Sequence, residues 1–221
     1  MNDHNISISR SEESILATNK VLKNTYLLLS MVLIFSGIVA AVGMSMNLGH
    51  GAALVSSIVA IALMWFVLPR TANSSAGIPV LFAITGLFGL GLGPILNHYM
   101  AINPGIVSTA LGGTGVIFLG LSGYALTTRK DFSFMGGFLM VGMLVVIGAS
   151  LLNIFLQMPV LSLVSSAAVI MLMSGFILYE TSSMIHNGET NYIMAAASLF
   201  LSILNLFQAL LHILGAFGGD D

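Results

Sequence analysis

Glu180 is the one carboxylate of this chain that falls inside a long apolar segment, where an ionisable side chain is by default a candidate functional group. It ends the run Gly175-Phe-Ile-Leu-Tyr-Glu180. Loss of water around a carboxyl disfavours its charged form, and no Lys or Arg is predicted at this depth to neutralise it. Glu180 is therefore a candidate proton or cation sensor. The alternative is a permanently neutral acid that hydrogen-bonds to a neighbouring helix.

Four polar residues are candidate partners of Glu180. The sixth and seventh apolar segments predict a helical hairpin, in which residues equally far from the turn lie at the same depth. Ser198 then comes level with Glu180, and Ser202 lies one turn deeper. Asn205 follows on the same polar face. His186 lies at the mouth of the hairpin, and histidine is the side chain type that most readily serves as a pH switch, although an interfacial hydrogen-bonding role is the alternative for it.

Polar side chains recur along two of the apolar segments. Those of the last segment stay within about 120° of one face, which we expect to turn inward. They are Ser202, Asn205, Gln208 and His212. A similar stripe toward the end of the fifth segment consists of Ser150, Asn153 and Gln157. Hydrogen bonding between helices is the ordinary explanation of such residues in lipid, and a water-filled path is the alternative.

An enzymatic interpretation rests mainly on Ser122 and His212, whose glycine-rich surroundings are similar to those of a rhomboid serine protease. A nucleophile needs its base within about 3 Å. These two residues are predicted near opposite faces of the membrane, roughly 15 Å apart in depth. The chain has no cysteine, and no two of its five histidines are spaced i, i+4 as zinc ligands on a helix often are. We therefore predict no enzyme, no cofactor and no metal site.

Composition identifies the chain as a membrane protein. Of its 221 residues, 57% are apolar and 6% are charged, and the mean hydropathy is +1.03, which leaves too little polar surface for a soluble domain. The net charge of −2 argues against nucleic acid as a partner. A span needs about 20 apolar residues. Seven segments qualify: 26–46, 51–68, 77–96, 105–126, 134–156, 160–185 and 192–217. All must be helices, because an open sheet leaves backbone groups unsatisfied in lipid.

The basic residues predict how this bundle of seven transmembrane helices is oriented. They all lie before the first segment or after the second and fourth: Arg10, Lys20, Lys23, Arg70, Arg129 and Lys130. The positive-inside rule then places the N-terminus in the cytoplasm and the C-terminus on the far side. The predicted organisation is a polar cytoplasmic tail at 1–24, a membrane domain at 25–217 and a short acidic tail at 218–221.

Small residues predict which helices approach most closely, because helices in lipid associate through close backbone contact. Thr85, Gly89 and Gly93 recur every four residues on the third segment. The fourth segment carries Ser108, Gly112, Gly115, Gly120 and Gly123. We therefore expect these two helices at the centre of the bundle. Pro94 interrupts the third helix and frees a carbonyl that a neighbour or water must satisfy.

Two motifs carry a family resemblance. The run Gly89-x-x-Leu92-Gly93-Pro94, followed by Ala110-x-x-x-Thr114, resembles the signature of the Bax inhibitor (transmembrane Bax-inhibitor-motif) family. Tyr179-Glu180 in the sixth segment and Asn205 in the seventh extend the resemblance to nearly the whole chain. Further segments, among them Asn153-Ile-Phe-Leu-Gln157, are similar to a proteobacterial branch of the family. The resemblance implies a multi-pass protein of the bacterial inner membrane with its C-terminus in the periplasm.

The resemblance to the proteobacterial branch implies a regulatory function. Its members bind FtsH, a membrane-anchored ATP-dependent protease, together with its partners HflK and HflC, and act as a substrate that restrains the protease. A polar tail of about 24 residues gives a processive protease a segment to grip, because it is too polar to form a core of its own. We expect this chain to be such a modulator of FtsH.

The wider family implies an alternative, a pH-sensitive calcium or proton leak. In such a leak, as the resemblance implies it, two carboxylates face each other from the sixth and seventh helices. Glu180 matches the first position, whereas Ser202 occupies the second. A serine supplies no second negative charge to a divalent cation, which prefers several oxygens including carboxylates. The resemblance therefore argues less strongly for calcium than for FtsH.

Overall fold

The computed structural model describes residues 3–186 and 191–218, with side chains from residue 19 onward. Its regular structure over these residues is helical, without a strand. The helices are α1 (Asp3–Ser45), α2 (His50–Ala62), α3 (Leu68–Thr71), α4 (Gly77–Ile102), α5 (Pro104–Thr128), α6 (Met135–Leu156), α7 (Pro159–His186) and α8 (Tyr192–Phe217), with a π-helical turn, η1 (Leu63–Val67), between α2 and α3. The connection 187–190 and the acidic residues Asp220 and Asp221 lie outside the described residues.

Seven helical stretches are long and apolar enough to cross a membrane, which confirms the predicted fold class. The second of them is longer than the sequence predicted. It runs from His50 to Thr71 and passes through Pro69, where we had expected it to end. Proline cannot donate a backbone hydrogen bond to the preceding turn, and the π-helical turn η1 lies directly before it. The distortion lets the helix continue past Pro69.

Local capping explains where two of the helices begin. Asn103 accepts a hydrogen bond from the Gly105 amide at 2.8 Å, and Pro104 takes the first helical position, where its missing N–H costs nothing. Asn191 caps α8 in the same way, accepting from the amides of Ile193 and Met194. These caps fix the entry of α5 and α8 into the membrane.

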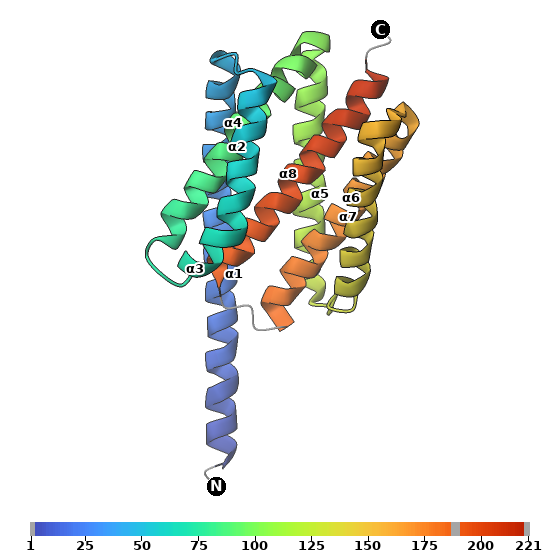
Figure 1. The fold of residues 1–221 in the computed structure, drawn as a ribbon. Coiled ribbons are helices and arrows are strands. Elements are labelled where there is room, and N and C mark those ends of the chain that lie inside the picture. Colours follow the sequence, from blue (N-terminus) through green and yellow to red (C-terminus); the bar gives the residue numbers. More distant parts are fainter. Residues whose placement is uncertain (1–2, 187–190, 219–221) are drawn as a thin grey trace.

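The helices alternate in direction, so their connections divide between two ends of the bundle (Figure 1). The connection after α3 and the one after α5 lie at the end from which the start of α1 projects, whereas α8 finishes at the opposite end. The basic positions Arg70 and Arg129 belong to the first of these ends, as the sequence predicted. Which end faces the cytoplasm stays a prediction.

Helix α8, and not α5, shares the centre of the bundle with α4. In the most apolar 18-residue stretch of each helix, 67% of the residues are buried in α8 and 56% in α4, against 22% in α5. A Cβ added at Gly112, Gly120 or Gly123 of α5 would meet nothing within 4 Å. The expectation that the fourth segment is central was therefore wrong. Its small residues leave an open face, while α8 packs against α1, α4, α5 and α7.

The glycines of α4 lie against the backbone of α1. A Cβ at Gly89 would overlap the carbonyl oxygen of Ser36, and one at Gly93 would lie 2.7 Å from the carbonyl carbon of Gly43. Backbone atoms cannot move aside as a flexible side chain can. The two helices therefore depend on glycine at these positions for their close approach.

Pro94 lies inside α4, and the helix continues through it. The carbonyl that proline leaves without its helical partner is that of Leu90. This carbonyl faces Gly43 of α1, whose Cβ position would lie 3.1 Å from its oxygen. One turn beyond the proline, the Asn97 side chain donates to the Met44 carbonyl at 3.1 Å. The proline segment is thus held against the end of α1.

Candidate functional site

The candidate site is the contact between Glu180 of α7 and Ser202 of α8. The Ser202 hydroxyl donates to both oxygens of the Glu180 carboxyl, at 3.4 Å to Oε1 and 3.3 Å to Oε2. Ser202 is buried, and Glu180 is partly buried. The antiparallel pairing of α7 with α8 brings the two residues together, although the sequence predicts Ser198 at the level of Glu180 and Ser202 one turn deeper. One carboxyl and one hydroxyl form the polar link at this point.

Of the other three predicted partners, Asn205 and His186 bond elsewhere in the described structure, and Ser198 lies against a different helix. Asn205 donates to the Leu201 carbonyl of its own helix at 2.8 Å. His186 places Nδ1 3.2 Å from the Ser182 carbonyl oxygen. Ser198 lines a hollow with residues of the second span, among them Trp65 and Pro69. Among the predicted partners, Ser202 is the one with a hydrogen bond to Glu180.

Sequence reasoning missed the connection between α1 and this site. The Tyr26 hydroxyl lies 3.2 Å from Thr181 Oγ1, directly after Glu180 in α7. Beside it on α1, Thr25 is fully buried, and its hydroxyl has no hydrogen-bond partner within the described part of the chain. The clustered hydroxyls of Thr181 and Ser182 after Glu180 were the available signal. The first and sixth spans are therefore tied together one residue from the acid.

Ser182 links the same end of α7 to the connection between α5 and α6. Its hydroxyl accepts from the Phe132 amide at 2.9 Å and lies 3.3 Å from the Lys130 carbonyl. Nearby, hydrogen bonds from the Ser133 side chain and amide hold the pKa of Asp131 below its usual value, and His186 contributes in the same direction. This end of the site therefore carries a carboxylate that stays charged.

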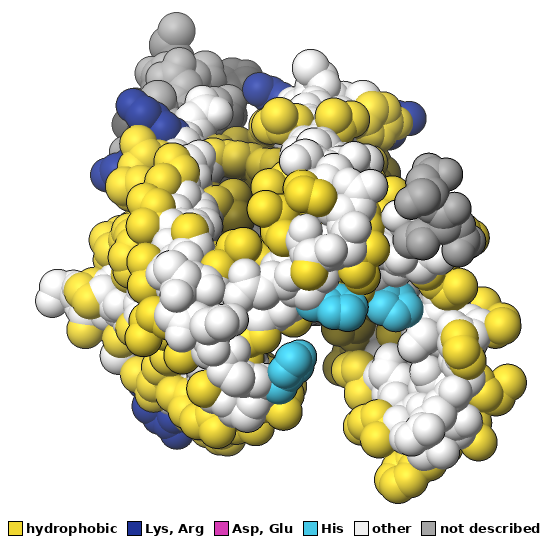
Figure 2. All heavy atoms as spheres, turned by 90° about the horizontal axis from the view of Figure 1, so that it is seen from above, with side chains coloured by type: hydrophobic (Ala, Val, Ile, Leu, Met, Phe, Trp, Pro, Cys, Tyr) yellow, Lys and Arg dark blue, Asp and Glu magenta, His cyan; other side chains and the backbone are white. Residues whose placement is uncertain are grey.

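A second polar site lies at the opposite end of the bundle, between α6, α7 and α8. Asn153 donates to Ser162 at 3.0 Å, and Ser166 lies 3.0 Å from His212 Nδ1. These residues line a hollow of about 320 Å³ with Ser150 and Ser165. Figure 2 views the molecule from this end and shows histidines near the middle of the face, with no acidic side chain among the coloured residues in view. Ser150 and Asn153 of one predicted polar stripe meet His212 of the other here, together with three serines of α7.

The structure does not bring Ser122 and His212 together. They lie toward the C-terminal ends of α5 and α8, which are at opposite ends of the bundle (Figure 1). His212 faces Ser166, and Ser122 has no hydrogen-bond partner among the described residues. In the same described part of the chain, no three His, Asp or Glu side chains gather as metal ligands. Ser122 therefore does not pair with His212 in this arrangement.

Positions of the family signature gather where helices meet. Gly89, Gly93 and Pro94 lie on α4 against α1, as described above. Ala110 and Thr114 lie on the buried side of α5, where the Thr114 hydroxyl donates to the Ala110 carbonyl at 2.7 Å. The signature therefore marks helix contacts in this chain, some distance from the Glu180 site along the sequence.

The seven-span helical fold, the glycine-proline motif and the acid in the sixth span together define a class of membrane protein. Residues 18–219 match the family described as inhibitor of apoptosis-promoting Bax1, and the chain belongs to that family. It is 48% identical over 214 residues to the Modulator of FtsH protease YccA of Escherichia coli K12, covering 96% of this chain and 97% of that protein.

Two further relatives cover most or all of this chain. An uncharacterised membrane protein of Vibrio cholerae is 47% identical over 223 residues, which is 100% of both chains. An uncharacterised protein of Pseudomonas aeruginosa is 45% identical over 203 residues, 91% of each chain.

Proposed function

We propose that this protein is an inner-membrane modulator of the ATP-dependent protease FtsH, acting as a substrate that restrains the protease. The observation that carries the proposal is the 48% identity to the E. coli protein named Modulator of FtsH protease YccA, over 96% of this chain. A second E. coli strain has a relative of the same identity that is named an inner membrane protein, which supports the location.

The form of α1 supports a role for the N-terminal segment as the part that the protease engages. Helix α1 begins at Asp3, whereas the apolar segment of the first span begins near Tyr26. The first turns of the helix project beyond the other helices (Figure 1). A processive protease needs a free segment to start from, and a polar helix that packs against nothing unfolds easily. HflK and HflC, as partners of FtsH, are proposed to take part in the same complex.

Deletion of residues 1–22 tests this proposal. We expect the shortened protein to escape degradation by FtsH and to lose its restraint of the protease in cells that overproduce it. The measurements are the half-life of the protein after synthesis is stopped and the degradation of a second FtsH substrate. A matched control replaces residues 3–18 with a shuffled sequence of the same composition, which keeps a polar segment of equal length. If the full chain leaves FtsH activity unchanged on overproduction, the proposed function is wrong.

The alternative function is a pH-sensitive leak for protons or cations, and the Glu180–Ser202 contact is the observation that favours it. This contact places a titratable group between the two helices of a hairpin inside the membrane. Protonation of Glu180 would change what Ser202 can donate to, and so could alter how α7 and α8 pack. A single carboxyl supports proton dependence better than it supports tight binding of calcium.

A further inference from the structure

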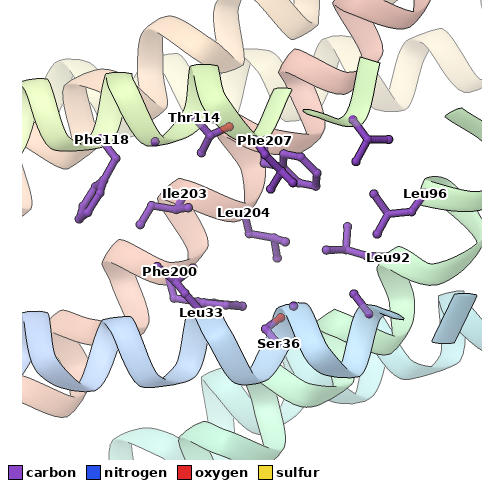
Figure 3. Close-up of a pocket in the computed structure, with 15 residues that line it drawn as sticks. Leu33, Ser36, Leu92, Leu96, Thr114, Phe118, Phe200, Ile203, Leu204 and Phe207 are labelled. Atoms are coloured by element: carbon purple, nitrogen blue, oxygen red, sulfur yellow. The ribbon is translucent and has the colours of Figure 1, made fainter. Parts of the chain in front are cut away.

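An apolar groove of about 360 Å³ lies between α1 and α5, with α4 and α8 behind it. Figure 3 shows Phe118 of α5, Leu204 of α8 and Leu92 of α4 directed into the space between the two outer helices. Neither the FtsH function nor the Glu180 site uses this space. It is lined by carbon, apart from the hydroxyl-bearing residues Ser36 and Thr114.

The groove is large enough to hold water, but its walls offer few groups that can hydrogen-bond to water. A buried water needs two to four polar partners, and cavities without them stay dry. The Thr114 hydroxyl already donates to the Ala110 carbonyl at 2.7 Å. The hollow around His212, lined by serines and Asn153, is by contrast well supplied with polar groups. An occupant of the groove between α1 and α5 must therefore be hydrocarbon.

The mouth of the groove opens sideways, into the region that the bilayer occupies. Leu111 of α5 is 58% exposed, and Gly37 of α1 is also exposed. Phe118, which lines the groove, packs against Tyr26 of α1, and their ring centroids are 6.2 Å apart. Both helices are membrane spans, so the medium at this mouth is the acyl chains of lipid.

We propose that the groove is an acyl-chain site, in which one hydrocarbon chain of a membrane phospholipid inserts between α1 and α5 and packs against Phe207 and Ile203 of α8. An empty space of this size would deprive its lining of contact atoms, and a chain that enters from the bilayer restores those contacts. The bound chain completes the packing of α1, the helix that carries the N-terminal segment, against the rest of the bundle.

Tryptophan fluorescence in bilayers of brominated phospholipid tests the site, because bromine on an acyl chain quenches tryptophan on contact. The chain has one tryptophan, Trp65, which is exposed. In a Trp65→Phe background, Phe207→Trp places the reporter on the inner wall of the groove, at a position that is 6% exposed. We expect it to be quenched by brominated chains, although bulk lipid cannot reach it. An unquenched reporter in a folded protein overturns the proposal.

Two glycines of α5 provide a matched pair of further variants. A Cβ at Gly115 lies in open space and Gly115 lines the groove, so Gly115→Leu should fill the site and abolish the quenching. Gly112→Leu adds the same side chain to open space on the same helix, outside the groove lining, and should leave the quenching unchanged. Equal quenching in the two variants would contradict an acyl-chain site.

Native mass spectrometry gives an independent measurement of bound lipid. It uses the chain without the tryptophan substitutions. The protein purified from membranes in mild detergent should retain phospholipid, and the Gly115→Leu variant should lose one bound phospholipid relative to Gly112→Leu. Identical lipid retention in the two variants would count against the site even if the reporter substitution disturbed folding.

Discussion

Ser202 donates to both oxygens of Glu180 across the hairpin of α7 and α8, and this hydroxyl–carboxyl contact determines what the site can do. One carboxyl can change its charge by a single proton, but it offers little negative charge to a divalent cation. The neighbouring contact of Tyr26 with Thr181 connects α1 to the same region. A change of protonation at Glu180 thus occurs next to contacts that join three spans.

Substitution of Glu180 by glutamine tests the alternative function, a pH-sensitive leak for protons or cations. Glu180→Gln keeps the shape of the side chain and removes its titration, so any proton-dependent ion flux in proteoliposomes should become independent of pH. Ser202→Asp is the companion variant, and it should increase calcium flux by supplying a second carboxylate. Calcium flux that responds neither to pH nor to either substitution would exclude a gating role for Glu180.

Among the elements, α1 and α4 form a pair in which glycine is required at the contact. Gly93 leaves 2.7 Å between its Cβ position and the carbonyl carbon of Gly43, and the Met44 amide nitrogen lies at 3.0 Å from the same position. The glycines of α5 have no comparable neighbours. Small residues on the two helices therefore have different consequences, depending on what each helix faces.

Alanine substitution tests whether glycine is required where α4 contacts α1 and dispensable on the open face of α5. Gly93→Ala should force α1 and α4 apart and lower the free energy of unfolding by about 1–3 kcal/mol, the usual cost of overpacking. Gly112→Ala adds a methyl group to open space and should be neutral or raise stability by roughly 0.5 kcal/mol, since alanine favours helix over glycine. Unfolding in mixed micelles measures both variants. Equal stabilities would contradict the close packing of α1 on α4.

For the molecule as a whole, orientation in the membrane decides which site meets which compartment. The end that carries Asp131 and His186 is predicted to face the cytoplasm, and the hollow around His212 is predicted to face the periplasm. Both assignments depend on the distribution of the six basic residues. The opposite placement of the start of α1 and the end of α8 is consistent with an odd number of spans (Figure 1).

Reporter fusions test this orientation. Alkaline phosphatase fused after Asp221 should be active, because the enzyme folds in the periplasm, and a fluorescent protein fused at the same position should be dark. Fusions within the connection after α5, beside Arg129, should show the reverse pattern. A fluorescent fusion after Asp221 would place the C-terminus in the cytoplasm and reverse the assignment of both polar sites.

The sequence by itself determined the number of spans and their approximate bounds, and it included Ser202 among four candidate partners of Glu180. Hydropathy over about 20 residues and the geometry of a helical hairpin are local properties that need no knowledge of distant contacts. The tertiary structure alone decided that α8 is central, that Ser202 is the residue bonded to Glu180, that Gly112, Gly120 and Gly123 of α5 face open space, and that Tyr26 reaches Thr181. These features depend on which face each helix turns toward its neighbours. In lipid the apolar side chains of buried and exposed faces have similar composition, so the pattern along one helix does not reveal that choice.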